Sequence, residues 1–148
     1  MDFVILCIGN KYGGDDGIGP YIANKLKNKE IDSFSVIDCG TNPENYTSTI
    51  KRLNPKILIL IDAVEMYLQP GEIRIIEKEK IGVMHISTHN IPISLLINYL
   101  EKYVKKIFFI GIQPKRMSGK LSEEAKKSSS FLIEHIINKK IEMIKIFD

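Results

Sequence analysis

The segment from Gly9 to Pro20 constrains the fold more than any other part of the chain. An apolar run, Phe3 to Ile8, precedes it, and a pattern with helical spacing follows it, in which Ile18, Ile22 and Leu26 recur. This order predicts a strand, a glycine-rich loop and a helix start within some twenty residues. The glycines allow the backbone to turn sharply where other side chains would clash.

Two adjacent acids, Asp15 and Asp16, lie on this loop. Neighbouring carboxylates repel each other unless they share a cation or a proton, so the loop is suited to holding a positive centre. We expect one of the two to cap the following helix and the other to face a functional site. A phosphate-binding loop is the rival interpretation, but neither glycine spacing of that class is present. Asp38 lies about as far after the loop as the acidic residue of a dinucleotide-binding motif does, and this alone keeps a nucleotide-binding alternative open.

The rest of the chain alternates between predicted strands and helices. Ile57 to Ile61 is apolar throughout, as in a parallel strand covered on both faces, and Asp62 is expected to end it. The other expected strands are 33–37, which ends at Asp38, an antiparallel edge strand at 72–77, and 107–112. One expected helix covers 45–53 and is stopped by Asn54-Pro55. A second begins at Asn90 as N-cap, with Pro92 just inside and Val104 on its apolar face, and a third is capped by Ser122. Residues 141–148 fit either continued helix or an extra strand.

This alternation predicts an α/β fold over a single domain, residues 1–148. It should be a three-layer sandwich, with a twisted, mostly parallel sheet of about five strands flanked by helices. Charged ends of parallel strands meet in one crevice, where open α/β sheets bind their ligands.

Composition excludes several classes of function. The net charge is +3, with lysines and glutamates interspersed, so nothing indicates a nucleic-acid partner. No apolar run is long enough for membrane insertion, and the first residues lack the basic region of a signal peptide. Cys7 and Cys39 have no metal or redox spacing and are interpreted as buried free thiols in a reducing compartment. We therefore expect a cytoplasmic protein.

Three polar side chains fall at comparable places in this scheme: Asp16 after the first strand, Asp62 after the central strand, and His89 before a helix. Two carboxylates and an imidazole can hold a divalent first-row metal while leaving coordination positions open. By spacing alone this is only suggestive, because such an Asp often caps a helix. His85 and His135 are expected to lie outside the site.

Short blocks in a fixed order make the chain similar to a known family. They are Gly9-Asn10 with 15–20, 38–45, 60–63, 70–74, 87–92 and 111–114. On these blocks the chain resembles the nickel–iron hydrogenase maturation endopeptidases, in particular the branch that processes the large subunit of formate hydrogenlyase-type hydrogenases. Tyr12, where the family has an apolar residue, and the poorly matched segment 115–120 depart from the pattern.

The resemblance implies a peptidase whose partner is the hydrogenase large-subunit precursor, from which it removes a short carboxy-terminal extension. The family's metal positions match Asp16, Asp62 and His89, and the nickel they contact is supplied by the substrate. Asp38 lies in a matching block and is, with Asp16, a candidate catalytic residue. Three loop ligands make a looser site than a closed cage, so we expect no tightly bound metal of the protein's own.

The sequence does not decide the catalytic mechanism, or whether the protein is a peptidase or a chaperone. Nickel could act as a Lewis acid, or it could only report readiness while Asp16 or Asp38 acts as general base. A nickel-binding maturation chaperone of the same fold, without peptidase activity, is the alternative function.

Overall fold

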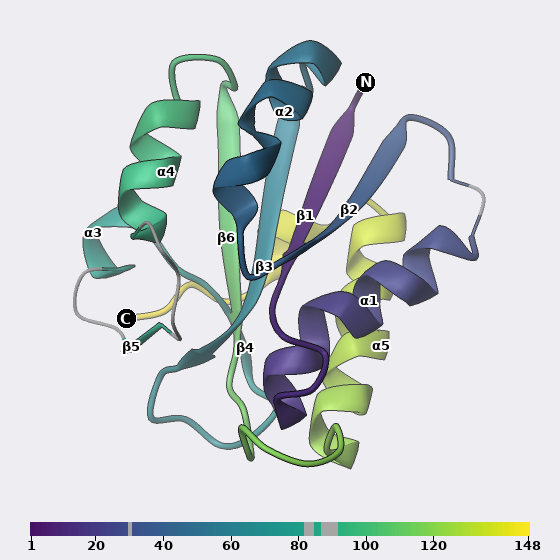
Figure 1. Ribbon diagram of the computed structural model, residues 1–148, viewed down its shortest axis with the longest axis vertical. Helices are drawn as coiled ribbons and strands as arrows, with labels where there is room; N and C mark the ends of the chain where they lie inside the picture. The colour runs from purple at the N-terminus through teal and green to yellow at the C-terminus, as the bar shows by residue number, and fades with distance from the viewer. Residues whose placement is uncertain (30, 82–84, 87–91) are drawn as a thin grey trace.

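The computed structural model describes residues 1–148 with the exception of residues 30, 82–84 and 87–91 (Figure 1). The strands are β1 (Phe3–Ile8), β2 (Phe34–Gly40), β3 (Ile57–Glu65), β4 (Ile73–Ile75), β5 (His85–Ile86) and β6 (Lys106–Ile112). The α-helices are α1 (Ile18–Lys27), α2 (Thr47–Leu53), α3 (Lys78–Ile81), α4 (Ile93–Leu100) and α5 (Glu123–Ile137). Three 3₁₀ turns accompany them: η1 (Gly14–Gly17), η2 (Pro43–Tyr46) and η3 (Ile141–Met143).

The strands form one sheet in the order β2-β1-β3-β6-β4, with β5 paired to the end of β3. β2, β1, β3 and β6 are parallel, whereas β4 is antiparallel to β6. Because Cys7 pairs with Ile61 and Ile61 pairs with Ile110, the carboxyl ends of the three central strands lie side by side. We call this end of the sheet the carboxyl edge.

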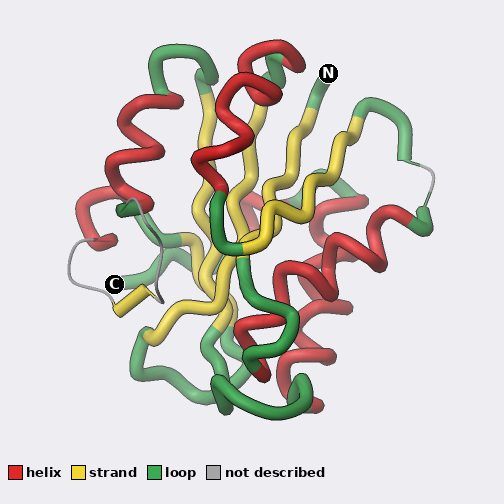
Figure 2. Tube along the Cα trace, viewed as in Figure 1, coloured by secondary structure: helices red, strands yellow, loops and turns green. Residues whose placement is uncertain are grey.

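Helices cover both faces of the sheet, which confirms the predicted three-layer α/β fold (Figures 1 and 2). Side chains alternate between the faces along each strand. Ile5, Ile59 and Ile110 pack under α1 and α5, while Leu6, Leu60 and Phe109 pack under α2, α3 and α4. None of the helices in the described ranges is long and apolar enough to cross a membrane.

Several elements lie where the sequence pattern predicts them. β4 is the antiparallel edge strand, and Asn54 ends α2 in a left-handed conformation with φ of 47°. The hydroxyl of Ser122 accepts a hydrogen bond from the N–H of Ala125, which makes Ser122 the N-cap of α5. Both cysteines are buried free thiols, as expected.

Other expectations were wrong in detail. β3 does not end at Asp62 but continues to Glu65, because Ala63 and Val64 are also buried and pair onward. β2 does not end at Asp38 but continues to Gly40, so Cys39 lies inside the strand.

The ends of two predicted helices also differ. α4 begins at Ile93 with Pro92 at the N-cap position and ends at Leu100, before Val104, while the expected cap Asn90 lies outside the described residues. Near the end of the chain, η3 is followed by a single parallel bridge between Ile75 and Ile146. The terminal segment therefore adds one bridge to the sheet edge rather than continuing the helix.

Candidate functional site at the carboxyl edge

The loop between β1 and α1 is held closely over the end of β1. Gly9 has a positive φ of 147°, and a Cβ there would lie 1.9 Å from the carbonyl oxygen of Asp16. A Cβ at Gly19 would lie 2.2 Å from the carbonyl oxygen of Ile8. Only glycine allows these approaches, so the glycines fix η1 and the start of α1 directly against the strand.

Asp16 is the acid of this loop that lies over the sheet. Its side chain is 7% exposed, and its Oδ2 accepts a hydrogen bond from the backbone N–H of Asn10 at 3.0 Å. The side chain of Asn10 in turn accepts from the N–H of Tyr12. η1 also packs against β3, the strand that carries Asp62. The sequence argument assigned no role to Asn10, although it belongs to the Gly9-Asn10 block.

Asp15 has a structural role instead. It is buried, and it accepts hydrogen bonds from the N–H groups of Lys115 and Ser122 and from the hydroxyl of Ser122, at 2.7 to 2.8 Å. Burial alone would raise the pKa of Asp15, but these hydrogen bonds together bring the pKa below its ordinary value. The expectation that one acid caps α1 was wrong, because the N-cap is Gly17 and no side chain caps it.

Asp62 lies within the sheet itself. It is fully buried, and it lies two residues from both Leu60 and Val64, so it shares their face of the sheet, which α2 and α4 cover. Removing a carboxylate from water is costly unless hydrogen bonds or a cation compensate for it. Asp62 also lies near the carboxyl edge, where open α/β sheets bind their ligands, and this makes it a candidate site residue.

Asp38 is the exposed acid of the site. It lies near the end of β2, and its Oδ1 accepts a hydrogen bond from the N–H of Gly40 at 3.2 Å. It lines a pocket of about 590 Å³ at the junction of the β1 and β2 ends. The other lining residues are Gly9, Asn10, Lys11, Tyr12, Pro20, Cys39, Gly40, Thr41 and Tyr46.

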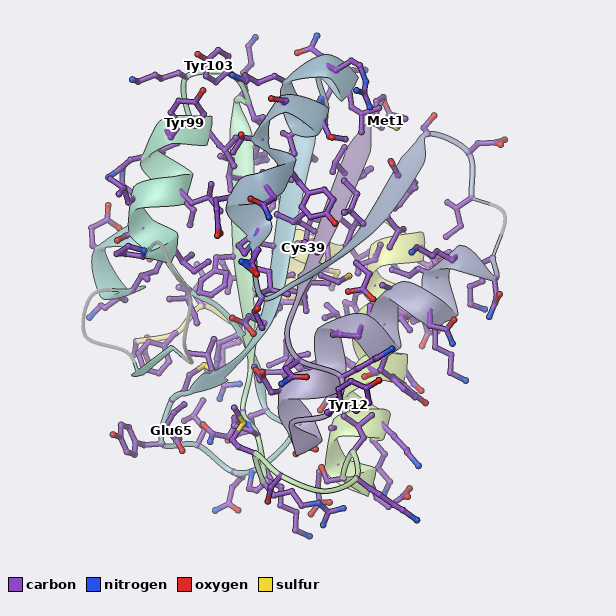
Figure 3. All side chains as sticks on the ribbon, viewed as in Figure 1. Met1, Tyr12, Cys39, Glu65, Tyr99 and Tyr103 are labelled. Carbon is purple, nitrogen blue, oxygen red and sulfur yellow. The ribbon has the colours of Figure 1, made fainter. Side chains whose placement is uncertain are left out.

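The thiol of Cys39 is affected by both Asp62 and Asp38. Burial raises the pKa of its thiol well above the ordinary value, and the negative charges of Asp62 and Asp38 raise the pKa further. Both carboxylates therefore act on the same sulfur, which donates a hydrogen bond to the carbonyl oxygen of Cys7. Figure 3 shows Cys39 near the middle of the molecule, with Tyr12 and Glu65 lower down toward the carboxyl edge. The sequence predicted the burial of Cys39 but not that the charges of Asp38 and Asp62 both act on its thiol.

The predicted site residues that the structure describes lie on elements of the carboxyl edge. The η1 turn with Asp16 packs against β3, which carries Asp62, and the charges of Asp38 and Asp62 both act on the Cys39 thiol. His89 lies outside the described residues. Among the residues that are described, no group of three or more His, Cys, Asp or Glu side chains is arranged to hold a metal ion, so the full ligand set stays a prediction. His135 is hydrogen-bonded within α5, to the carbonyl of Phe131.

Gln113 is a residue that sequence reasoning did not assign. It follows β6, is buried, and binds two backbone N–H groups of the loop after β3 through its Oε1. The only signal in the sequence was its place in the block from Gly111 to Pro114.

Comparison with known proteins gives consistent matches. The family model described as hydrogenase maturation protease matches residues 20–139. The hydrogenase 3 maturation protease of Escherichia coli K12 is 44% identical over 115 residues, which cover 77% of this chain and 74% of that protein.

Solved structures agree at the level of the whole fold. A crystal structure of a hydrogenase 3 maturation protease superposes with a TM-score of 0.93 at 32% identity, covering 100% of this chain and 97% of the other. A nickel–iron hydrogenase maturation protease from Thermococcus kodakarensis KOD1 gives a TM-score of 0.84 at 29% identity, covering 94% and 92% of the two chains.

Proposed function

The chain belongs to the hydrogenase maturation protease family and is a peptidase; on this premise we propose that it removes a short carboxy-terminal extension from the large-subunit precursor of a nickel–iron hydrogenase. The precursor is cut once it carries nickel. We place this processing in the cytoplasm, where the reduced thiols Cys7 and Cys39 persist.

The observation that carries the proposal is the buried carboxylate of Asp62 on a strand against which the Asp16 turn packs. In the proposed complex Asp16, Asp62 and His89 hold the nickel of the substrate. Two carboxylate oxygens and one imidazole nitrogen suit a divalent first-row metal and leave positions for ligands from the precursor. Recognition is then the completion of a shared coordination sphere.

Two routes to peptide hydrolysis are open within this proposal, and they give Asp38 different roles. In the first, nickel polarises the scissile carbonyl or a water as a Lewis acid. In the second, nickel only reports that the precursor is ready, and Asp38 or Asp16 takes the proton of the attacking water as general base. Asp38 suits this work because it is exposed and lines the pocket beside the site. Asp38→Asn should lower kcat about 10²-fold or more if Asp38 is the general base, and should leave kcat near normal if Asp16 or nickel does this work.

The protein is proposed to hold no tightly bound metal of its own. Three ligands from separate loops form a more open site than a closed Cys and His cage. After dialysis against a chelator, elemental analysis should find far less than one metal ion per chain. Stoichiometric metal that survives this treatment would contradict the idea that the substrate supplies nickel.

The deciding experiment offers nickel-free and nickel-loaded precursor to the purified protein side by side, with tail release followed by mass spectrometry. We expect cleavage of the loaded precursor alone. Equal cleavage of both would indicate a protease that recognises the peptide itself. Binding of the loaded precursor without cleavage would instead favour a nickel-binding chaperone.

A further inference from the structure

The loop that follows β3 is held by an unusual set of hydrogen bonds. The backbone N–H groups of residues 66 to 69 all donate to side-chain oxygens rather than to the backbone. Gln113 accepts from Met66 and Leu68, whereas Glu65 accepts from Tyr67 and Glu72 accepts from Gln69. With every donor of the turn occupied, the path of this loop is fixed by side chains on both sides of it.

Gln113 is the centre of this arrangement. It is 4% exposed, its Oε1 lies 2.8 Å from the nitrogen of Met66 and 3.1 Å from that of Leu68, and its Nε2 donates to Glu65 at 2.7 Å. A buried amide that satisfies both its acceptor and its donors is costly to replace. The loop is therefore anchored to the core through β6.

Tyr67 stands at the tip of this fixed loop in a conformation that suits it poorly. Its φ is 57°, in the left-handed region where glycine or asparagine is preferred and a bulky side chain is strained. Its side chain is 86% exposed, so no packing within the chain compensates for the strain. Backbone strain that a protein keeps in this way gathers at functional positions, and stability alone does not account for an aromatic residue here.

The position of Tyr67 relates it to the candidate site. β3 carries the chain about 10 Å beyond Asp62 before the strand ends at Glu65, and Tyr67 lies past that point. It is therefore outside reach of the reacting atoms but on the same carboxyl edge. Tyr12, 79% exposed, stands on the loop after β1 beside the site pocket. In Figure 3 Tyr12 and Glu65 mark the two sides of this edge.

We propose that Tyr67 is a docking residue that inserts its ring into an apolar pocket on the folded body of the hydrogenase large-subunit precursor. The proposal rests on the proposed function, which makes the substrate a folded protein. An exposed, convex aromatic ring with a hydroxyl at its end needs a concave, largely apolar partner with one polar group. Aromatic residues held rigidly in this way are the usual anchors of protein interfaces.

The test uses the full chain with Tyr67→Gly and Tyr67→Asn, which remove the ring and suit a left-handed backbone. Tyr103→Ala is the matched control, since Tyr103 is an exposed tyrosine at the opposite end of the molecule (Figure 3). The measurements are kcat and KM for tail release from nickel-loaded precursor, the Kd for the same precursor, and the Tm of each variant.

Both Tyr67 variants should raise KM and Kd about tenfold or more with kcat unchanged, as expected when an interface anchor is truncated. Their Tm should equal or exceed that of the parent chain, because the backbone strain is relieved. Tyr103→Ala should leave KM and Kd unchanged.

Unchanged KM and Kd in both Tyr67 variants would overturn the proposal. If these variants instead alter only the oligomeric state in solution, Tyr67 contacts a second copy of the chain and the proposal fails as well. If the parent chain binds the precursor but does not cut it, the proposed function fails while the Kd comparison still decides the role of Tyr67. If the parent chain does not bind the precursor, both fail.

Discussion

Ser122 donates two hydrogen bonds to Asp15, one from its backbone N–H to Oδ1 and one from its hydroxyl to Oδ2, each at 2.7 Å. The same hydroxyl accepts the N–H of Ala125 at the start of α5. One serine thus joins the loop of the candidate site to the last helix of the chain. Asp15 accepts from three donors in all, and protonation would turn one of its oxygens into a donor, which gives the contact a pH dependence.

Replacing Asp15 by asparagine should lower the free energy of unfolding by about 1–3 kcal/mol at neutral pH, because an amide cannot accept from all of its present donors. The folded-state pKa of Asp15 is depressed, so its contribution is complete above the ordinary aspartate value of about 3.9 and is lost as the pH falls through the folded-state value. Urea unfolding of both proteins at pH 7 and below pH 3 measures the difference.

The gap in stability between the parent chain and Asp15→Asn should therefore shrink in acid. Asp32→Asn is the control, because Asp32 is exposed, and it should stay within about 0.5 kcal/mol of the parent chain. A gap that stays constant from pH 7 to below pH 3 would show that the charge of Asp15 does not matter.

Gly14 and Gly40 have nearly the same backbone conformation but different surroundings. Replacing each by alanine therefore separates the cost of a steric clash from the cost of backbone strain. Gly14 has φ of 60° and Gly40 has φ of 57°. A Cβ on Gly14 would lie 2.6 Å from the backbone of Ser118, whereas a Cβ on Gly40 meets nothing within 4 Å. Gly40→Ala should cost about 1–2 kcal/mol of left-handed strain, and Gly14→Ala should cost clearly more. Thermal unfolding of the two variants gives the comparison, and equal losses would mean that the loop at Ser118 moves aside freely.

The fully buried Asp62 is expected to be indispensable for processing. Asp62→Asn preserves the shape of the side chain and removes its charge, so tail release should fall at least about a hundredfold while circular dichroism stays native. Asp16→Asn and His89→Gln should act in the same direction. His135→Gln, in α5, is the control that should process precursor at nearly the normal rate. If alanine at positions 16, 62 and 89 left processing normal in each case, the site would lie elsewhere.

The two thiols should be inert in the folded protein. Burial raises the pKa of both Cys7 and Cys39, and the acids near Cys39 raise its pKa further, so the reactive thiolate is scarce at neutral pH. A thiol reagent at pH 8 should titrate almost nothing in the native protein and both cysteines in denaturant. Rapid native reaction of Cys39, which lines the site pocket, would show that the pocket wall opens to solvent.

The order of elements follows from the sequence because the central strands are local, continuous apolar runs. β1, nearly all of β3 and the second half of β6 are buried on both faces, and such runs are typical of parallel strands between helices. The length of β3 was underestimated because an acid usually marks the end of a strand. Asp62 instead lies in mid-strand, where it is fully buried and the pairing with β6 continues through it to Ala63.

The partition of roles between the two neighbouring acids could not be predicted locally. Asp15 bonds Ser122, which is 107 positions later in the chain, and no pattern around either residue signals this contact. No local pattern signals the role of Gln113 either, because it accepts a hydrogen bond from the N–H of Met66, which is 47 positions earlier in the chain. Both contacts exist only after the helices and strands have packed.

The tie between Asp15 and Ser122 also has a consequence during synthesis. The ribosome adds roughly 5–20 residues per second, so the partner of Asp15 emerges several seconds or more after the glycine-rich loop has left the exit tunnel. Until α5 docks, the loop lacks the contacts at Lys115 and Ser122 that hold it. A nascent chain in which β1, β2 and β3 have emerged therefore still lacks the hydrogen bonds that hold this loop until Lys115 and Ser122 follow.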